Sequence, residues 1–170
     1  MRDTPLKKFE SRARDQIPLF ILVCLTVLSG INFYLPNYNA VAINFPLIGI
    51  YYWSLHRPDL LGPIPVFFIG LLYDFLIGNP PGMSALIFVA IQGLIGARRK
   101  TLLAQAFWVH WLAFFGTVVV ASFSLWLIGS IWYSTLMNPF SFLFQGLLTL
   151  SVFPLLVGLM GWLRIKLLKV

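Results

Sequence analysis

The chain has 170 residues, of which 59% are hydrophobic and only 10% are charged. A soluble domain carries about 25% charged residues, so the composition excludes an ordinary soluble protein. It predicts an all-α integral membrane protein with one polytopic domain over residues 1–170. The net charge of +7 does not indicate nucleic-acid binding, because the basic residues stand in short clusters between apolar runs, without interleaved aromatic residues on which bases stack.

Six apolar segments follow a basic N-terminal stretch at 1–16, and each is expected to be a transmembrane helix. The expected spans are 17–35, 40–55, 63–77, 83–97, 102–128 and 140–163. A helix needs about 20 apolar residues to cross a bilayer, and the second to fourth segments are shorter, which leaves room for local thinning, kinks or a re-entrant piece. The first segment is expected to be a retained helix and not a signal peptide, because no cleavage site follows it.

The positions of the basic residues predict the orientation. If the N-terminus is cytoplasmic and the chain crosses six times, the inside segments contain all 12 lysine and arginine residues. These inside segments are 1–16, 56–62, 98–101 and 164–170. Short cytoplasmic loops carry such an excess of lysine and arginine, so both termini are expected in the cytoplasm. The basic cluster Arg98, Arg99 and Lys100 either sets this orientation alone or also contacts a cytosolic partner.

Asp74 is the only carboxylate inside an apolar segment, and a charge near lipid costs free energy unless it is hydrated or paired. The third helix is expected to stop at Gly78, a residue suited to a helix C-cap, because Pro80 and Pro81 prevent continuation. We expect the Asp74 carboxylate to accept hydrogen bonds from backbone N–H groups at the start of the fourth helix, which would brace the hairpin. A contact with a partner or a lipid headgroup, and a proton or ion relay, are the alternatives.

No catalytic or metal-binding site is predicted. His56 is expected to be solvated at the inner face, His110 to hydrogen-bond a neighbouring helix, and Cys24, the only cysteine, to be buried. Catalytic groups must converge to within about 3 Å of the reacting atoms, whereas Asp74 and His56 are expected at opposite faces of the membrane. The sequence therefore predicts no enzyme, no cofactor and no metal ion.

Small residues recur on one face of the fifth and sixth expected helices, at spacings typical of close helix approach. This face either packs inside the bundle or docks a transmembrane helix of a partner. Its proline is expected to kink the sixth helix. The residues of this face are Ala113, Thr117, Ala121, Gly146, Pro154, Gly158 and Gly161.

Two motifs, one on each side of the third expected helix, resemble the MreD family of bacterial rod shape-determining proteins. The first is a loop that follows a tryptophan, and the second is a glycine-rich hairpin. The matching residues are Trp53, Arg57, Pro58, Asp59, Gly70, Asp74, Gly78, Pro81 and Gly82. The resemblance implies that they form a structural or partner-binding motif, although Pro80 and Met83 depart from the usual hairpin of the family.

The resemblance further implies a non-enzymatic scaffold in the bacterial inner membrane that belongs to the cell-wall elongation machinery. MreC is the main expected partner, and MreB, RodA and a class B penicillin-binding protein would belong to the same complex, surrounded by membrane lipids. The fold would be similar to the substrate-binding subunits of energy-coupling-factor transporters. The alternative function is therefore small-solute uptake, although the first span lacks the alanine-rich face by which those subunits dock and the spans offer few polar groups for a ligand.

Overall fold

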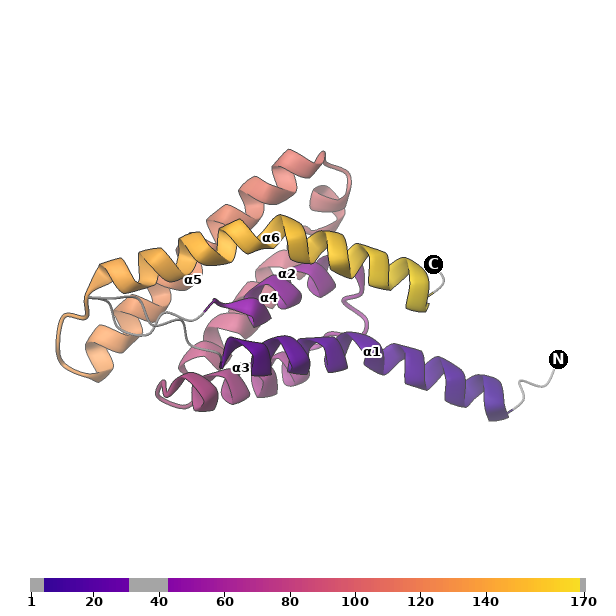
Figure 1. Cartoon of the computed structure of the whole chain (residues 1–170), viewed down its shortest axis with the longest axis horizontal. Coiled ribbons are helices and arrows are strands. Elements are labelled where there is room, and N and C mark those ends of the chain that lie inside the picture. Colours follow the sequence, from indigo (N-terminus) through magenta and orange to yellow (C-terminus); the bar gives the residue numbers. More distant parts are fainter. Residues whose placement is uncertain (1–4, 31–42, 169–170) are drawn as a thin grey trace.

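A computed structural model of the chain describes residues 5–30 and 43–168, and within these ranges it contains six α-helices and no strand, as the predicted all-α class requires. The helices are α1 (Pro5–Ser29), α2 (Phe45–His56), α3 (Pro63–Ile77), α4 (Met83–Leu103), α5 (Phe107–Trp132) and α6 (Pro139–Leu168). Figure 1 shows that α1 begins and α6 ends at the same end of the bundle. An even number of membrane crossings requires this arrangement.

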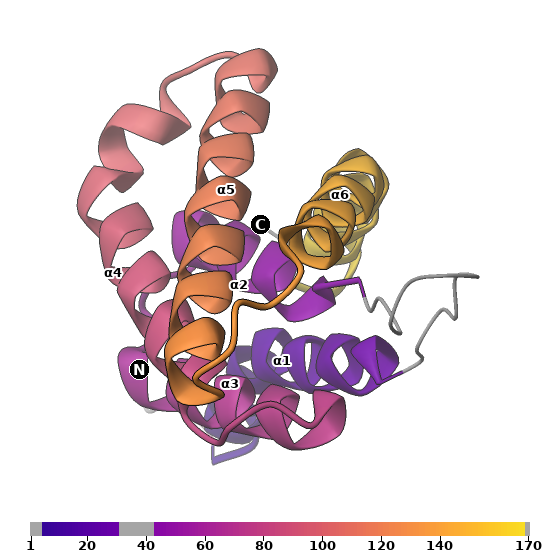
Figure 2. The ribbon, with the colours of Figure 1, turned by 90° about the vertical axis from the view of Figure 1, so that its left-hand side faces the viewer.

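The second helix is the centre of the bundle and not an ordinary span. It has only 12 residues, about 18 Å at 1.5 Å per residue, and every residue from 46 to 55 is buried. A helix that is apolar on all sides is buried by its neighbours, and α2 contacts α1, α3, α4 and α6. Figure 2 shows α2 in the middle of the other helices.

The α3 and α4 helices form an antiparallel hairpin that depends on one glycine. A Cβ atom on Gly70 would overlap the Cα atom of Ala85 and lie 2.8 Å from its backbone nitrogen. Only a residue without a side chain therefore allows α3 to approach α4 this closely, in the manner of small-residue contacts between membrane helices.

An aromatic cluster joins α2 to α5 and α6. The rings of Phe114 and Phe153 stack with their centroids 3.9 Å apart, and Tyr51 meets them edge-on at 5.1 and 5.8 Å. The Tyr51 hydroxyl also donates a hydrogen bond to the backbone oxygen of His110 at 3.0 Å. These contacts combine favourable ring geometry with a satisfied hydroxyl, so they hold the last two helices against the central one.

The α5 and α6 helices expose most of their apolar surface. Among the described residues, the segments Trp108–Trp132 and Pro139–Lys166 are the two helical stretches long and apolar enough to cross a membrane, and within an apolar stretch of 18 residues in each only 28% of the residues are buried. An apolar helix that its own bundle leaves uncovered is suited to lipid or to a partner. The six-span arrangement itself remains a prediction.

Several boundaries differ from those expected. The α4 helix continues through the basic cluster to Leu103, so the turn before α5 lies at 104–106 and not at 98–101. Arginine, lysine and leucine favour helix, and no glycine or proline interrupts the segment. As a result, α5 begins and ends later than the expected span 102–128. The expected junction of the first two spans falls largely within 31–42, outside the described residues.

Two expectations about single residues have different outcomes. Cys24 is exposed on α1 and not buried, because it lies on the side of α1 that other helices do not cover. Pro154 lies inside α6, halfway along it, and Figure 1 shows that α6 changes direction near its middle. A proline removes one backbone hydrogen bond and kinks a helix in this way.

We predict that Gly70→Ala strongly destabilises the bundle, because the added methyl group overlaps the backbone of Ala85. The expected loss is about 2 kcal/mol or more in the free energy of unfolding, measured by equilibrium unfolding in mixed detergent micelles followed by circular dichroism. Gly93→Ala is the matched control, because a Cβ atom at this helical glycine meets nothing within 4 Å. Equal stability of the two variants would refute the close contact between α3 and α4.

Candidate functional site

The Asp74 carboxylate is fully buried and caps the start of α4. Its Oδ2 atom accepts a hydrogen bond from the Gly82 backbone N–H at 2.9 Å. The Ser84 N–H donates to Oδ1 at 3.0 Å and to Oδ2 at 3.1 Å. The expected contact with the N-terminus of the fourth helix is thus present, and a negative charge is favourable there because the backbone N–H groups and the helix dipole point toward it.

The backbone oxygen of the same residue ends α3. It accepts hydrogen bonds from the N–H groups of Gly78 at 2.9 Å and Asn79 at 3.0 Å. Gly78 has φ of 81° and Gly82 has φ of 96°, which is the left-handed region where a side chain is unfavourable. One residue, Asp74, therefore fixes both helix ends of the hairpin, and two glycines let the chain turn between them.

A second polar network at this end of the bundle was not foreseen from the sequence. The Gln145 side chain donates to the Tyr73 hydroxyl at 3.1 Å. The Thr149 hydroxyl donates to the Gln145 backbone oxygen at 2.7 Å and accepts from the Asn44 N–H at 3.1 Å. These bonds connect α6 to α3 and to the start of α2. The only signal in the sequence was the occurrence of polar residues inside an apolar segment.

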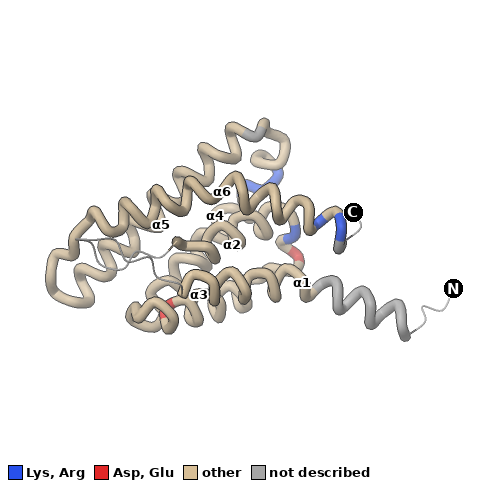
Figure 3. The backbone as a smooth tube through the Cα atoms, viewed as in Figure 1, with Lys and Arg blue, Asp and Glu red and all other residues tan. Residues whose placement is uncertain are grey.

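The two halves of the predicted motif lie at opposite ends of α3. Trp53 is fully buried in α2, and the Arg57 guanidinium pairs with Asp59 at 3.2 Å in the exposed connection between α2 and α3. The 15 residues of α3, about 22 Å at 1.5 Å per residue, separate this connection from Asp74. Figure 3 shows the described lysines and arginines gathered toward the end that carries the C-terminus. The motif therefore forms two separate structural features, the connection before α3 and the hairpin after it, and not one site.

The basic cluster on α4 contains one residue with a structural role. The Arg99 side chain turns inward, where Nε donates to the Leu55 carbonyl at 2.6 Å and Nη2 donates to the His56 carbonyl at 3.3 Å. A cation is favourable at the C-terminus of a helix, so Arg99 caps α2. Arg98 and Lys100 are exposed on α4. Sequence spacing carries no signal for this cap, because α2 and Arg99 are far apart in the chain.

Both histidines differ from expectation. His56 is only partly exposed; its Nδ1 atom lies 2.9 Å from the Tyr52 carbonyl, and its ring stacks on the Tyr52 ring. The His110 ring bonds the Ala106 carbonyl of its own helix at 3.2 Å and not a neighbouring helix. In both cases the imidazole meets the carbonyl four residues earlier, which lies about one helical turn back along the chain.

The small-residue face divides between two environments. Ala121 is buried, and a Cβ atom on Gly146 would meet Val118 and Ser122 of α5 at 3.2 and 3.3 Å. These positions serve packing between α5 and α6. Gly158, in contrast, is exposed, and a Cβ atom there would meet nothing within 4 Å. The remaining members of the face are partly or fully exposed: Ala113, Thr117, Pro154 and Gly161.

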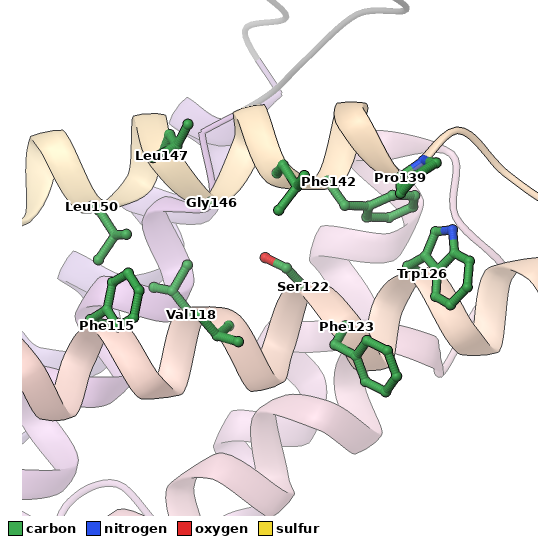
Figure 4. A pocket seen from close by; sticks show the side chains of 12 residues that line it. Phe115, Val118, Ser122, Phe123, Trp126, Pro139, Phe142, Gly146, Leu147 and Leu150 are labelled. Carbon is green, nitrogen blue, oxygen red and sulfur yellow. The ribbon is translucent and has the colours of Figure 1, made fainter.

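An apolar groove of about 630 Å³ runs between α5 and α6. Figure 4 shows side chains of both helices lining it, with Ser122 pointing into it from α5 and Gly146 on the α6 side. Phe123 of α5 and Leu147 of α6, both lining residues, are more than half exposed. The groove therefore presents hydrocarbon with almost no hydrogen-bonding group, which suits an apolar partner and not a polar solute.

The described residues contain no group of three or more histidine, cysteine, aspartate or glutamate side chains close enough to hold a metal ion. The Asp74 carboxylate is saturated by backbone N–H groups. The described part of the chain therefore has three main features. They are a braced hairpin at one end, basic residues at the other end, and an apolar groove between two exposed helices.

A family model described as the rod shape-determining protein MreD matches residues 13–167, nearly the whole chain. The chain belongs to the MreD family. Membership associates it with the determination of rod shape and with the membrane, as a structural component. Comparisons with curated proteins and with solved structures found no match.

We predict that Asp74→Asn lowers the free energy of unfolding by about 1 kcal/mol and Asp74→Ala by about 3 kcal/mol. Asparagine keeps one acceptor for the N–H groups of Gly82 and Ser84, whereas alanine leaves them buried and unsatisfied. Equilibrium unfolding in detergent micelles measures both effects. Asp59→Asn is the control: this carboxylate is exposed, so its loss should cost less than about 0.5 kcal/mol. A wild-type stability for Asp74→Ala would show that the carboxylate does not brace the hairpin.

Proposed function

We propose that the protein is a non-enzymatic scaffold of the cell-wall elongation machinery, which binds MreC and helps to maintain rod shape. Membership of the MreD family supports this role, and the observation that carries it is the uncovered apolar groove of α5 and α6. In an apolar stretch of 18 residues in each of these two long helices, only 28% of the residues are buried. The helices therefore offer a large surface for binding inside a membrane.

The groove fits the transmembrane helix of a single-span partner such as MreC. A partner helix of leucine-like side chains would gain van der Waals contacts along both α5 and α6, which is the main source of helix association in lipid. The small side chains at Ser122 and Gly146 keep the floor of the groove low, so that a helix can approach closely. The exposed residues Gly158 and Pro154 extend this surface along α6.

The proposed setting is the bacterial inner membrane, with six crossings and both termini in the cytoplasm. The clustering of the described lysines and arginines at one end (Figure 3) supports this orientation, because positive residues are retained on the cytoplasmic side. The exposed Arg98 and Lys100 would then face the cytosol. Through MreC the protein would join MreB, RodA and a class B penicillin-binding protein in one complex; this assignment rests on the family resemblance. No specific observation favours the uptake function, and we do not propose it.

We predict that Phe123→Ala weakens binding of MreC about tenfold, because it removes an aromatic anchor from the groove. The measurement is recovery of MreC by co-purification of the full-length proteins from mild detergent across a concentration series. Phe75→Ala is the matched control, since Phe75 is exposed to a similar degree on α3 and does not line the groove. Equal recovery with both variants would contradict docking in the groove. Recovery of an ATPase-bearing transport module in place of MreC would overturn the scaffold function.

We predict that Gly78→Leu and Gly82→Leu also weaken recovery of MreC. Both glycines have positive φ, where a leucine is strained, so the hairpin that Asp74 organises would change shape. The control is Gly96→Leu, a helical position at which a Cβ atom meets nothing within 4 Å. Normal yields of the complex with both hairpin variants would refute a contribution of the hairpin to assembly.

A further inference from the structure

The basic end of the bundle contains a guanidinium nitrogen that the described protein leaves without a hydrogen-bond partner. We call the residues Tyr52, His56, Arg99 and Arg164 the donor cluster. They come from α2, α4 and α6, which meet at this end. None of them belongs to the apolar groove or to the braced hairpin, so the proposed scaffold function leaves them unexplained.

Arg164 is the centre of the donor cluster. Its Nε atom is shielded from solvent and makes no hydrogen bond within the described part of the chain. Its positive charge lies close enough to act on both the Tyr52 phenol and the His56 imidazole. One turn earlier on α6, a Cβ atom at Gly161 would lie 3.9 Å from the Tyr52 hydroxyl. The last turns of α6 therefore pack against the last turn of α2 and bring the guanidinium to it.

Tyr52 also holds a donor that can face a ligand. The residue is 3% exposed, and its hydroxyl can donate a hydrogen bond. The His56 Nδ1 atom lies 2.9 Å from the Tyr52 carbonyl. A carbonyl only accepts, so Nδ1 donates this bond, and the His56 ring stacks on the Tyr52 ring beside the hydroxyl.

Among the described side chains, no carboxylate pairs with Arg164. The two carboxylates with described side chains are used elsewhere: Asp59 pairs with Arg57, and Asp74 caps α4. Arg99 already donates to two carbonyls of α2, which carry only partial charges. A partly buried guanidinium beside a second cation is stabilised by an anion.

We propose that the donor cluster binds the phosphate group of an anionic lipid headgroup. Guanidinium groups form paired, charge-assisted hydrogen bonds with phosphate, and the Tyr52 hydroxyl supplies a further donor. On the same turns of α6 the Lys166 ammonium lies 4.6 Å from the centre of the Trp162 ring. Tryptophan and lysine of this kind mark the headgroup depth of a membrane. Basic groups between helices at that depth recognise lipid headgroups.

The test uses the purified full-length protein in a neutral detergent. Its thermal unfolding is followed by circular dichroism during titration with phosphatidylglycerol, phosphatidylcholine or glycerol phosphate. A ligand that binds only the folded protein raises the unfolding temperature according to its concentration and affinity. We expect stabilisation by phosphatidylglycerol, weaker stabilisation by phosphatidylcholine and none by glycerol phosphate at equal concentration. Equal stabilisation by glycerol phosphate would refute a lipid headgroup as the ligand and would indicate a free phosphate compound.

The decisive comparison is between two arginines at the same end. Arg164→Gln should weaken the apparent affinity for phosphatidylglycerol about tenfold, because charge-assisted hydrogen bonds are lost. Arg98→Gln removes the same charge from an exposed position of α4 and should change the affinity by less than about twofold. Equal losses in both variants would overturn the site, since general surface charge would then explain the lipid effect.

Two conservative variants keep the proposal testable if Arg164→Gln fails to fold. Arg164→Lys keeps the charge but loses the paired geometry, and Tyr52→Phe removes only a hydroxyl. Both should fold, as judged by circular dichroism and gel filtration, and both should weaken phosphatidylglycerol binding several-fold. Wild-type affinity in both variants would refute recognition of the phosphate by these side chains.

Discussion

The hydrogen bonds between the Asp74 carboxylate and the first backbone N–H groups of α4 are the constraint on which the rest of this bundle depends. A carboxylate that is 0% exposed must find donors within the protein, and this one finds them at the start of the following helix. This contact determines where the chain turns back. The close approach at Gly70 then holds α3 and α4 side by side, and the pair forms one wall around α2.

The backbone groups at both ends of the central helix α2 also need hydrogen-bond partners within the protein. A short buried helix leaves backbone groups unpaired at each terminus, and no water is present in a bilayer to satisfy them. The Asn44 side chain accepts a hydrogen bond from the Leu47 N–H at the start of α2, and Arg99 donates to two carbonyls at its end. The residue just before α2 and an arginine of α4 thus complete its two ends, which explains how a helix of only 12 residues serves as the core of the bundle.

This arrangement separates a closed part of the protein from an open part. The helix α2 is enclosed by its neighbours, whereas α5 and α6 leave side chains along their shared groove exposed. The aromatic stack of Phe114 and Phe153 fastens the open pair to α2. The MreD family, to which the chain belongs, is that of a structural component in the determination of rod shape.

The sequence by itself determined the helical class, the family, the hairpin cap by Asp74 and the turn at Gly78, because local patterns and the scarcity of charge in apolar segments carry that information. It did not show that α2 is the core, that Arg99 caps it, that Gln145 reaches Tyr73, or that Cys24 is exposed. It also predicted that the fourth helix ends before the basic cluster, whereas α4 continues through this cluster. Only the tertiary structure decided these points, because they depend on which face of each helix meets another. The membrane-length stretches of these helices contain few polar residues, so hydrophobic periodicity does not distinguish the buried face from the open one.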